Sequence, residues 1–522
     1  MSQVHMDKCR GGLVPTLLFA TLLAVGTAYL CLVLYCHADY PLLDSDICCW
    51  MAIDRQIFDA FPNVGKIVMA HYRASLELLF AFPFMLMFGC TTFSAFLANA
   101  FLAAAAICVL ALCMSLRRSD DGSRLVAAPL RMAAIALGGF AIYPVNCGHC
   151  PTYLFASLAW LLSVHRLGAL RLRCAMLFIL SFLGWMSDDM FAVVGIVPMA
   201  ALGGYRWLMS RRVPVDAASV AIGAAFGRFF AKCLVWWGVW DHPVLHPSIL
   251  PVNMWHSAAA KAGATFLELF CHGDAGGASK TLGLLMIVLA GGSLLYSTAM
   301  LVRKRESATV LLPPLCGTIA LTLSYSLLGT ECAANSLEVV PRYLFWAGVC
   351  MVSCVAPLLH SRSLSVRVAV TVFFLCFAAN AFQVQFWSKR GNAGCRSDMK
   401  DLSAHLVSNG ASRVCAEWWT AYALECAAGN ALRVRPMPTG GTCEAGDRHL
   451  VCAGVFSEPM QAVVIPLCTQ LDATFAANNV VARFGPADKV EDFKGFRIMY
   501  YRNGITFSPA NAIRSFVKVN ET

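Results

Sequence analysis

The sequence predicts a polytopic α-helical membrane protein of about eleven crossings, followed by a C-terminal exoplasmic α/β domain. Hydrophobic residues make up 58% of the 522 residues and charged residues only 13%, whereas a soluble domain carries about a quarter charged residues. The apolar stretches end near Trp387, and the remainder of the chain is polar. We therefore divide the chain into a multispanning domain, 1–387, with an exoplasmic loop at 37–73, and a soluble domain, 388–522.

Apolar runs that span a bilayer, or nearly so, recur along the first domain. A crossing helix needs about 20 mostly apolar residues, so the shorter runs must borrow flanking residues. The expected spans are Leu13–Cys36, Phe93–Leu116, Leu125–Tyr143, Thr152–His165, Cys174–Met186, Met190–Met209, Val215–Trp240, Thr281–Val302, Val310–Gly329, Tyr343–His360 and Val366–Trp387. The first follows Lys8 and Arg10 and has no small-residue cleavage site, so we expect a retained signal-anchor helix. We interpret Ala74–Gly89, which contains Pro83, as interfacial or re-entrant.

Basic clusters between the spans predict the orientation. One cluster follows every second span, so all of them lie on the same side of the membrane. The clusters are Arg117/Arg118/Arg124, His165–Arg173, Arg206–Arg212, Arg303–Arg305 and Arg362–Arg367. Because cytoplasmic loops are rich in Lys and Arg, we place these clusters and the N-terminus in the cytoplasm. The remaining loops and the C-terminal domain are then exoplasmic. Membrane topology accounts for the net charge of +10, and we expect no nucleic-acid partner.

The C-terminal domain shows mixed helix and strand patterns. A helix is expected at Asp398–Ser408, and Asn503-Gly504 is a hairpin-turn signal after the strand Phe496–Tyr501. Further strands are expected at Arg413–Ala416, Leu432–Arg435 and Leu450–Phe456. Six cysteines lie here, namely Cys395, Cys415, Cys426, Cys443, Cys452 and Cys468. An even number in an exported domain favours disulfides, and buried thiols are an equal alternative.

Acidic residues at the ends of two spans are the main candidates for function. Asp44 and Asp46 open the first exoplasmic loop, and Asp188 and Asp189 follow the span Cys174–Met186. Carboxylates at a membrane boundary are costly unless they are solvated or used, and both pairs come out on one face. Helix capping is the ordinary alternative for each. Asp188 and Asp189 also offer the oxygen ligands that a divalent cation prefers, so such a cation is the candidate cofactor.

Basic residues on the same face are candidate phosphate ligands. Arg228 and Lys232 share a face of one helix and lie about 12 and 6 Å below the aromatic belt that starts at Trp236. This depth suits a lipid phosphate. Lys232 has snorkelling as its alternative, while Arg228 is expected to have a partner inside the protein. The other candidate substrate-binding residues are His71, Arg73 and Arg342, and an interfacial anchor is an equal alternative for Arg342.

With the motif Asp44-Ser45-Asp46 directly after the first span, the sequence resembles the GT-C glycosyltransferases. These membrane enzymes, among them protein O-mannosyltransferases and aminoarabinose transferases, take a sugar from a polyprenyl phosphate carrier. The resemblance covers the layout of the whole chain and includes one short motif. It implies that Asp46, or else Asp44, is the general base, that Arg342 contacts phosphate, and that transfer inverts the anomeric centre. It also implies the bacterial inner membrane, with the C-terminal domain in the periplasm.

We therefore expect an integral membrane glycosyltransferase that moves a sugar from a polyprenyl phosphate carrier to a lipid, glycan or protein acceptor. A polyprenyl-linked glycan ligase or polymerase is one alternative, because Asp241–Lys280 carries several histidines. A flippase or transporter is another, although no internal repeat is visible. A redox protein built on Cys147-Gly148-His149-Cys150 is disfavoured, because no thioredoxin pattern surrounds these residues. No Walker loop, Rossmann fingerprint or zinc-ligand spacing is present.

The orientation is testable with a reporter that works only outside the cytoplasm. Fused after Trp387, the reporter should be active, because an exoplasmic C-terminal domain requires it. Fused after Arg305, within a cytoplasmic basic cluster, it should be inactive. The opposite result at both positions would invert the topology and move the acidic residues to the cytoplasmic face.

Overall fold

The computed structural model describes most of the chain, and it divides into two compact units. The described residues are 3–37, 72–89, 92–118, 125–142, 149–211, 213–236, 248–272, 277–303, 306–329, 341–360, 363–385, 394–416, 418–428, 431–436, 459–467, 480–481 and 484–505. The first unit comprises Met1–Tyr35, Leu97–Lys232 and Leu245–Arg390. The second comprises Cys36–Phe96, Cys233–Val244 and Gly391–Thr522.

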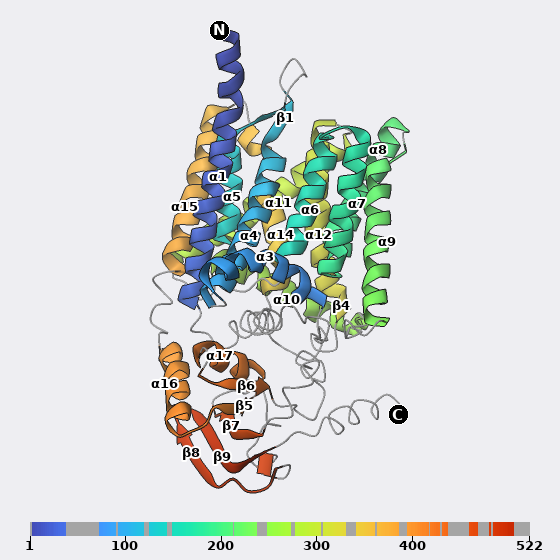
Figure 1. The fold of residues 1–522 in the computed structure, drawn as a ribbon. Coiled ribbons are helices and arrows are strands. Elements are labelled where there is room, and N and C mark those ends of the chain that lie inside the picture. The colour runs from blue at the N-terminus through green and yellow to red at the C-terminus, as the bar shows by residue number, and fades with distance from the viewer. Residues whose placement is uncertain are drawn as a thin grey trace. The chain divides into compact units, whose positions relative to one another are not determined.

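The first unit is a bundle of helices that lie side by side (Figure 1). Its helices are α1 (Gln3–His37), α4 (Thr92–Ser115), α5 (Pro129–Ala141), α6 (Cys150–His165), α7 (Leu170–Ser187), the π-helix η2 (Ala192–Ile196), α8 (Val197–Ser210), α9 (Val215–Trp236), α10 (Val252–Cys271), α11 (Gly277–Val302), the 3-10 helix η3 (Glu306–Leu311), α12 (Leu312–Leu327), α14 (Pro341–Ser353), the 3-10 helix η4 (Leu358–His360) and α15 (Leu364–Gln383). Two short antiparallel ladders join β1 (Leu116–Arg118) to β2 (Leu125–Ala127) and β3 (Ser248–Ile249) to β4 (Leu328–Gly329). A helix overlaps every expected span.

The helices confirm a polytopic helical membrane protein. Eight of them in the described residues are long and apolar enough to cross a membrane. Two more apolar helices, Pro129–Ala141 and Leu344–Ser353, are shorter. As expected for a short run, α7 recruits flanking residues and begins at Leu170. The segment Asp241–Lys280 was expected to be a loop, but it contains the helix α10.

In the second unit, the structure describes one helix ahead of the C-terminal domain. This helix, α3 (Tyr72–Phe88), contains Pro83 and covers most of Ala74–Gly89. It is not among the eight candidate spans. Its interfacial or re-entrant position stays a prediction.

The C-terminal part of the second unit is built on a five-stranded sheet of order β6-β5-β7-β9-β8. The elements are α16 (Gly394–Ser408), β5 (Arg413–Ala416), α17 (Trp418–Ala428), β6 (Arg433–Pro436), β7 (Met460–Pro466), β8 (Lys489–Phe493) and β9 (Phe496–Ile505). Strands β6 and β7 are parallel to β5, while β9 is antiparallel to β7 and β8. The predicted helix and three predicted strands are confirmed, and Leu450–Phe456 lies outside the described residues.

The predicted hairpin turn at Asn503-Gly504 is wrong. Strand β9 runs on to Ile505, and its ladder with β7 shifts register near this point. The hairpin turns instead at Lys494 and Gly495, between β8 and β9, where φ is 45° and 80°. Positive φ at both central residues is what a two-residue turn of type I′ requires.

The two faces of the sheet carry separate cores. On one face, α16 and α17 cover the strands through buried apolar residues that include Leu402, Leu406 and Leu424. On the other face, Met460, Val463 and Met499 belong to a second cluster. Cys415 is buried on this second face, and the pairing of the domain's cysteines stays a prediction.

Glu491 on the edge strand β8 ties the sheet to α16. Its Oε1 accepts hydrogen bonds from His405 Nε2 at 2.7 Å and Tyr500 Oη at 2.8 Å. Lys489 Nζ lies 2.7 Å from Oε2. The Lys489 ammonium, assisted by His405 and Tyr500, lowers the pKa of Glu491 from 4.5 to about 2.

The lowered pKa predicts an acid-dependent contribution to stability. Ionised Glu491 stabilises the folded domain fully above about pH 4.5, and this contribution is lost as the pH falls towards 2. The unfolding temperature should therefore be higher for the native protein than for Glu491→Gln at pH 6, with the difference shrinking below pH 4. A difference that stays constant between pH 6 and pH 3 would contradict this assignment.

Candidate functional site

A buried pair of a carboxylate and an imidazole joins the start of α6 to the end of α7. His149 precedes α6 and Asp188 follows α7. His149 Nδ1 is in direct contact with Asp188 Oδ2, and each side chain is only 2% exposed. The other oxygen, Oδ1, accepts a hydrogen bond from the Met190 N–H at 3.0 Å. Asp188 thus holds the turn after α7 and also binds a second segment. The residue at the N-cap of the following helix is Phe191.

The ring of Phe191 packs between Gly184 and Gly195 and so fixes the turn that contains Asp188. A Cβ on Gly184 would lie 2.3 Å from Phe191 Cδ2, and a Cβ on Gly195 would lie 2.5 Å from Phe191 Cζ. Only glycine at both positions leaves room for the buried ring. The next residues form the π-helix η2, a rare geometry that is frequent at functional sites.

Stacked aromatic side chains support the pair from within the bundle. The ring centroid of Tyr153, on α6, lies 6.1 Å from that of His149. Tyr153 stacks on Trp346 of α14 at 4.8 Å, with 4° between the ring planes. Both aromatic rings are fully buried. The orientation of α6 is therefore fixed against α14, the helix that also contains Arg342.

Arg228 and Lys232 lie on the outside of the bundle. Both side chains are exposed on α9, and the Arg228 guanidinium carbon lies 5.7 Å from the ring centroid of Trp185 on α7. The partner found for Arg228 in the described part of the chain is therefore this aromatic ring, and the role of Arg228 in phosphate binding stays a prediction. Trp185 lies three residues before Asp188, so Arg228 is near the same end of α7.

The other predicted site residues are placed only in part. Asp189 is exposed beside the buried Asp188. Helices α3 and α14 contain Arg73 and Arg342, whose side chains are outside the described set. Asp44, Asp46 and His71 lie outside the described residues. Whether all of these residues meet in one cavity stays a prediction.

Metal binding at Asp188 and Asp189 also stays a prediction. In the described ranges, no group of three or more His, Cys, Asp or Glu side chains is placed to hold a metal ion. One oxygen of Asp188 contacts His149 and the other accepts from a backbone N–H. A cation at this point would need Asp189 and ligands from other segments.

The pairing of His149 with Asp188 was not predicted from the sequence. The two residues are 39 positions apart, and no local spacing connects them. In the sequence, His149 stands out only as part of the candidate redox motif Cys147-Gly148-His149-Cys150. The available signal was that both residues occupy short loops assigned to the same face of the membrane.

The fold is similar to that of a crystal structure with a bound lipid. The chain superimposes on the crystal structure of ArnT from Cupriavidus metallidurans bound to undecaprenyl phosphate with a TM-score of 0.56, over 92% of this chain and 97% of that one. The chain has a GT-C-like fold. The two sequences are 12% identical, so the likeness concerns the fold. No family model and no curated protein matches the sequence.

A double-mutant cycle tests the coupling of His149 and Asp188. Asp188→Ala leaves His149 buried without its carboxylate, and breaking a buried pair costs roughly 3–5 kcal/mol. The double variant with His149→Ala should lose less than the sum, with a coupling of about 0.5–3 kcal/mol in unfolding by SDS in mixed micelles. Asp189→Ala, a change at an exposed neighbour, should stay within about 0.5 kcal/mol of the native protein. Additive losses would show that the pair is not coupled.

Proposed function

We propose that this chain is an integral membrane glycosyltransferase that moves a sugar from a polyprenyl phosphate carrier to a lipid, glycan or protein acceptor. One observation carries the proposal, namely the fold shared over 92% of the chain with a protein crystallised with undecaprenyl phosphate. The shared length takes in both the helix bundle and the C-terminal domain. Among the described candidates, Asp188 and Asp189 at the end of α7, and Arg228 beside Trp185 of the same helix, support it.

The proposed reaction forms one bond to the anomeric carbon and breaks another. An acceptor hydroxyl attacks this carbon, the bond to the carrier phosphate oxygen breaks, and its electron pair leaves with the polyprenyl phosphate. Asp46, with Asp44 as the second candidate, takes the hydroxyl proton as general base. Arg342, His71 and Arg73 are the proposed contacts for the phosphate and sugar, since fixed cations stabilise charge that develops on a leaving group. Direct displacement inverts the anomeric centre.

The two aspartates after α7 have different proposed roles. Asp188 is buried and both of its oxygens are engaged, so we assign it as a positioning residue that holds the turn against α6. Asp189, next to it, is exposed to solvent. An exposed carboxylate can bind an acceptor hydroxyl or a divalent cation. The contact between His149 and Asp188 therefore holds Asp189 in position for the substrate.

The proposed site faces the exoplasm, on the side away from the basic clusters. The positive-inside pattern favours a cytoplasmic N-terminus and an exoplasmic C-terminal domain. The resemblance to GT-C enzymes implies a bacterial inner membrane facing the periplasm. A flippase would bind the same lipid without forming a glycosidic bond. A ligase or polymerase would use a polyprenyl-linked glycan donor. Product analysis with defined donors separates these three classes.

Substitution of the first acidic motif tests the proposal. Asp46→Asn keeps the side-chain size but removes the proton acceptor, so transfer in proteoliposomes should fall about 10²–10⁴-fold while the donor still binds. Asp44→Asn, made in parallel, decides which acid has the role. If Asp46 only caps a helix, Asn is nearly as good a cap and activity should barely change. Full activity in both variants would remove this motif from the mechanism.

A further inference from the structure

An arginine cluster lies at the end of the bundle where α6 and α8 end and α7 and α9 begin. Its members are Arg166, Arg171, Arg173, Arg206 and Arg211. Asp216, at the start of α9, is the carboxylate that pairs with the cluster in the described part of the chain. This end is opposite the contact between His149 and Asp188, which joins the start of α6 to the end of α7. The basic clusters of the sequence predict that it is cytoplasmic.

Two arginines of the cluster join helices to one another. Arg173 Nε lies 3.0 Å from one oxygen of Asp216, and Arg206 Nη1 lies 3.7 Å from the other. Arg206 also donates hydrogen bonds to two carbonyl groups at the end of α6. Both arginine side chains are largely buried. Because two cations share a single carboxylate, this packing network keeps one positive charge.

The other three arginines, Arg166, Arg171 and Arg211, add their charges at the surface. All three are exposed, and within the described ranges none of them forms an ion pair. Five arginines and one aspartate leave the cluster a net charge of +4. Arg166 and Arg173 also repel the charge of Arg206. A bound anion would relieve this repulsion.

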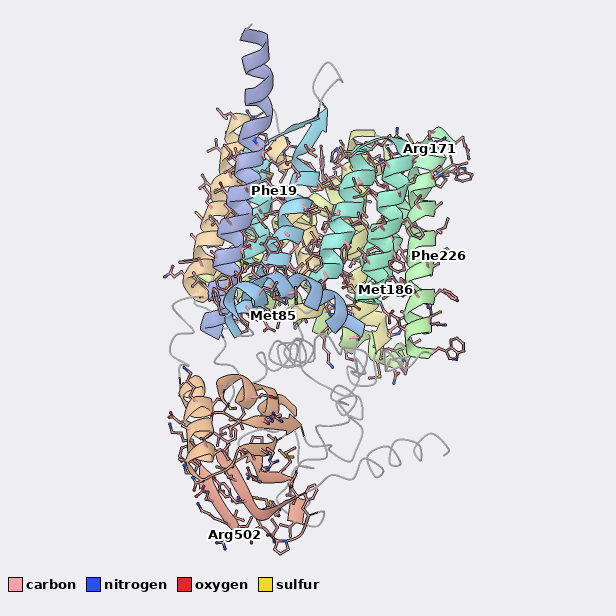
Figure 2. The ribbon with its side chains drawn as sticks, in the orientation of Figure 1. Phe19, Met85, Arg171, Met186, Phe226 and Arg502 are labelled. Atoms are coloured by element: carbon pink, nitrogen blue, oxygen red, sulfur yellow. The ribbon has the colours of Figure 1, made fainter. Side chains whose placement is uncertain are left out.

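Arg171 lies where the helix dipole opposes a cation. It is in the first turn of α7 (Figure 2), and that turn contains no acidic residue. The N-cap residue, Ala169, makes no side-chain hydrogen bond to the N–H groups of the turn. A helix N-terminus carries a partial positive charge, so an anion is stabilising there and a cation is not. An anion next to Arg171 would therefore offset both the arginine charge and the dipole.

The surroundings of the cluster place it at the level of lipid headgroups. Helices α7, α8 and α9 each contain a candidate membrane span with one end here. Trp207 is 46% exposed, and the Arg211 guanidinium carbon lies 5.3 Å from its ring centroid. Tryptophan favours the boundary between membrane and water. Below Arg171, the exposed side chains of Leu172, Met176 and Ile179 form an apolar stripe on one face of α7.

We propose that Arg166, Arg171 and Arg211 bind the headgroup of an acidic phospholipid from the leaflet on this side of the membrane. Guanidinium groups would donate charge-assisted hydrogen bonds to the phosphodiester oxygens, and an acyl chain would lie along the apolar stripe of α7. A zwitterionic headgroup would bring its own cation to the cluster, so the excess of positive charge selects an acidic lipid. The site is at the opposite helix ends from the proposed reaction and does not depend on the proposed function.

Lipid binding to the full-length protein tests this site. The dissociation constant of phosphatidylglycerol, measured by native mass spectrometry in detergent, should rise about fivefold in Arg166→Gln and in Arg171→Gln. It should rise about 25-fold in the double variant, because each basic residue near the headgroup contributes separately to the attraction. Arg303→Gln is the matched control and should bind like the native protein, since Arg303 is exposed after α11 in another basic cluster on the same predicted side. Phosphatidylcholine with the same acyl chains should bind more weakly, and equally to every variant.

Unfolding by SDS in mixed micelles separates lost lipid binding from lost folding. Without added lipid, the double variant should be at least as stable as the native protein, since it removes like charges and keeps Arg173 and Arg206. Added phosphatidylglycerol should stabilise the native protein more than the double variant, because a ligand of the folded state raises its stability. A double variant that unfolds more readily without lipid would assign the two arginines to folding and overturn the site.

The remaining outcomes identify the occupant. Unchanged affinity in a folded double variant overturns the site, and equal binding of phosphatidylcholine overturns the selectivity for an acidic headgroup. Inorganic phosphate that displaces phosphatidylglycerol assigns the cluster to a free anion, and undecaprenyl phosphate that displaces it assigns the cluster to a polyprenyl lipid. Either result overturns the phospholipid. Absence of sugar transfer, measured in parallel, overturns the proposed function and leaves the lipid site in place.

Discussion

The buried contact between His149 and Asp188 holds together the part of the bundle on which the proposed chemistry depends. It fastens the start of α6 to the end of α7, across 39 residues of chain. A buried carboxylate is stable only when it is paired and hydrogen-bonded, and the imidazole and the Met190 N–H meet that need. Because Asp188 is fixed in this way, the exposed Asp189 beside it has a defined position at the end of α7.

A second aspartate fastens the opposite ends of the same helices. Asp216 lies at the start of α9. Its Oδ1 is 3.0 Å from Nε of Arg173 on α7, and its Oδ2 is 3.7 Å from Nη1 of Arg206 on α8. Arg206 also donates hydrogen bonds to the Ser163 and Val164 carbonyls at the end of α6, both at 3.0 Å. Residues counted as positive-inside charge therefore also join four helices. Helix α7, with Arg171 and Met186 near its two ends in Figure 2, is held at both.

Helix α7 connects the two proposed parts of the site. One flank meets α6 through the acid–imidazole pair, and the other meets α9 through glycines that leave no space for a side chain. The first contact sets the position of Asp189, and the second sets Arg228 on Trp185. Helix α7 is therefore held on both flanks, and the candidates Asp189 and Arg228 are positioned through it.

Apolar runs in the sequence were sufficient to predict the long apolar helices of the bundle, although not α10. Within a bilayer each backbone group must be satisfied internally, so an apolar run of sufficient length forms a helix whatever its neighbours are. This is why even the run at Val366–Trp387, with no motif, is found as α15. The likeness to GT-C enzymes followed from the same local information, because that family is recognisable by the order of its spans and loops.

Which side chains meet could not be predicted from the sequence, because it depends on the packing of the helices. That Asp188 pairs with His149, and that Arg228 lies outside the bundle on Trp185, depend on how each helix is rotated about its axis. The apolar runs are hydrophobic on most sides, so their periodicity does not reveal this rotation. The hairpin at Lys494-Gly495 prevailed over Asn503-Gly504 for a related reason. Both pairs suit a turn, and the pairing of β9 with β7 and β8 selects between them.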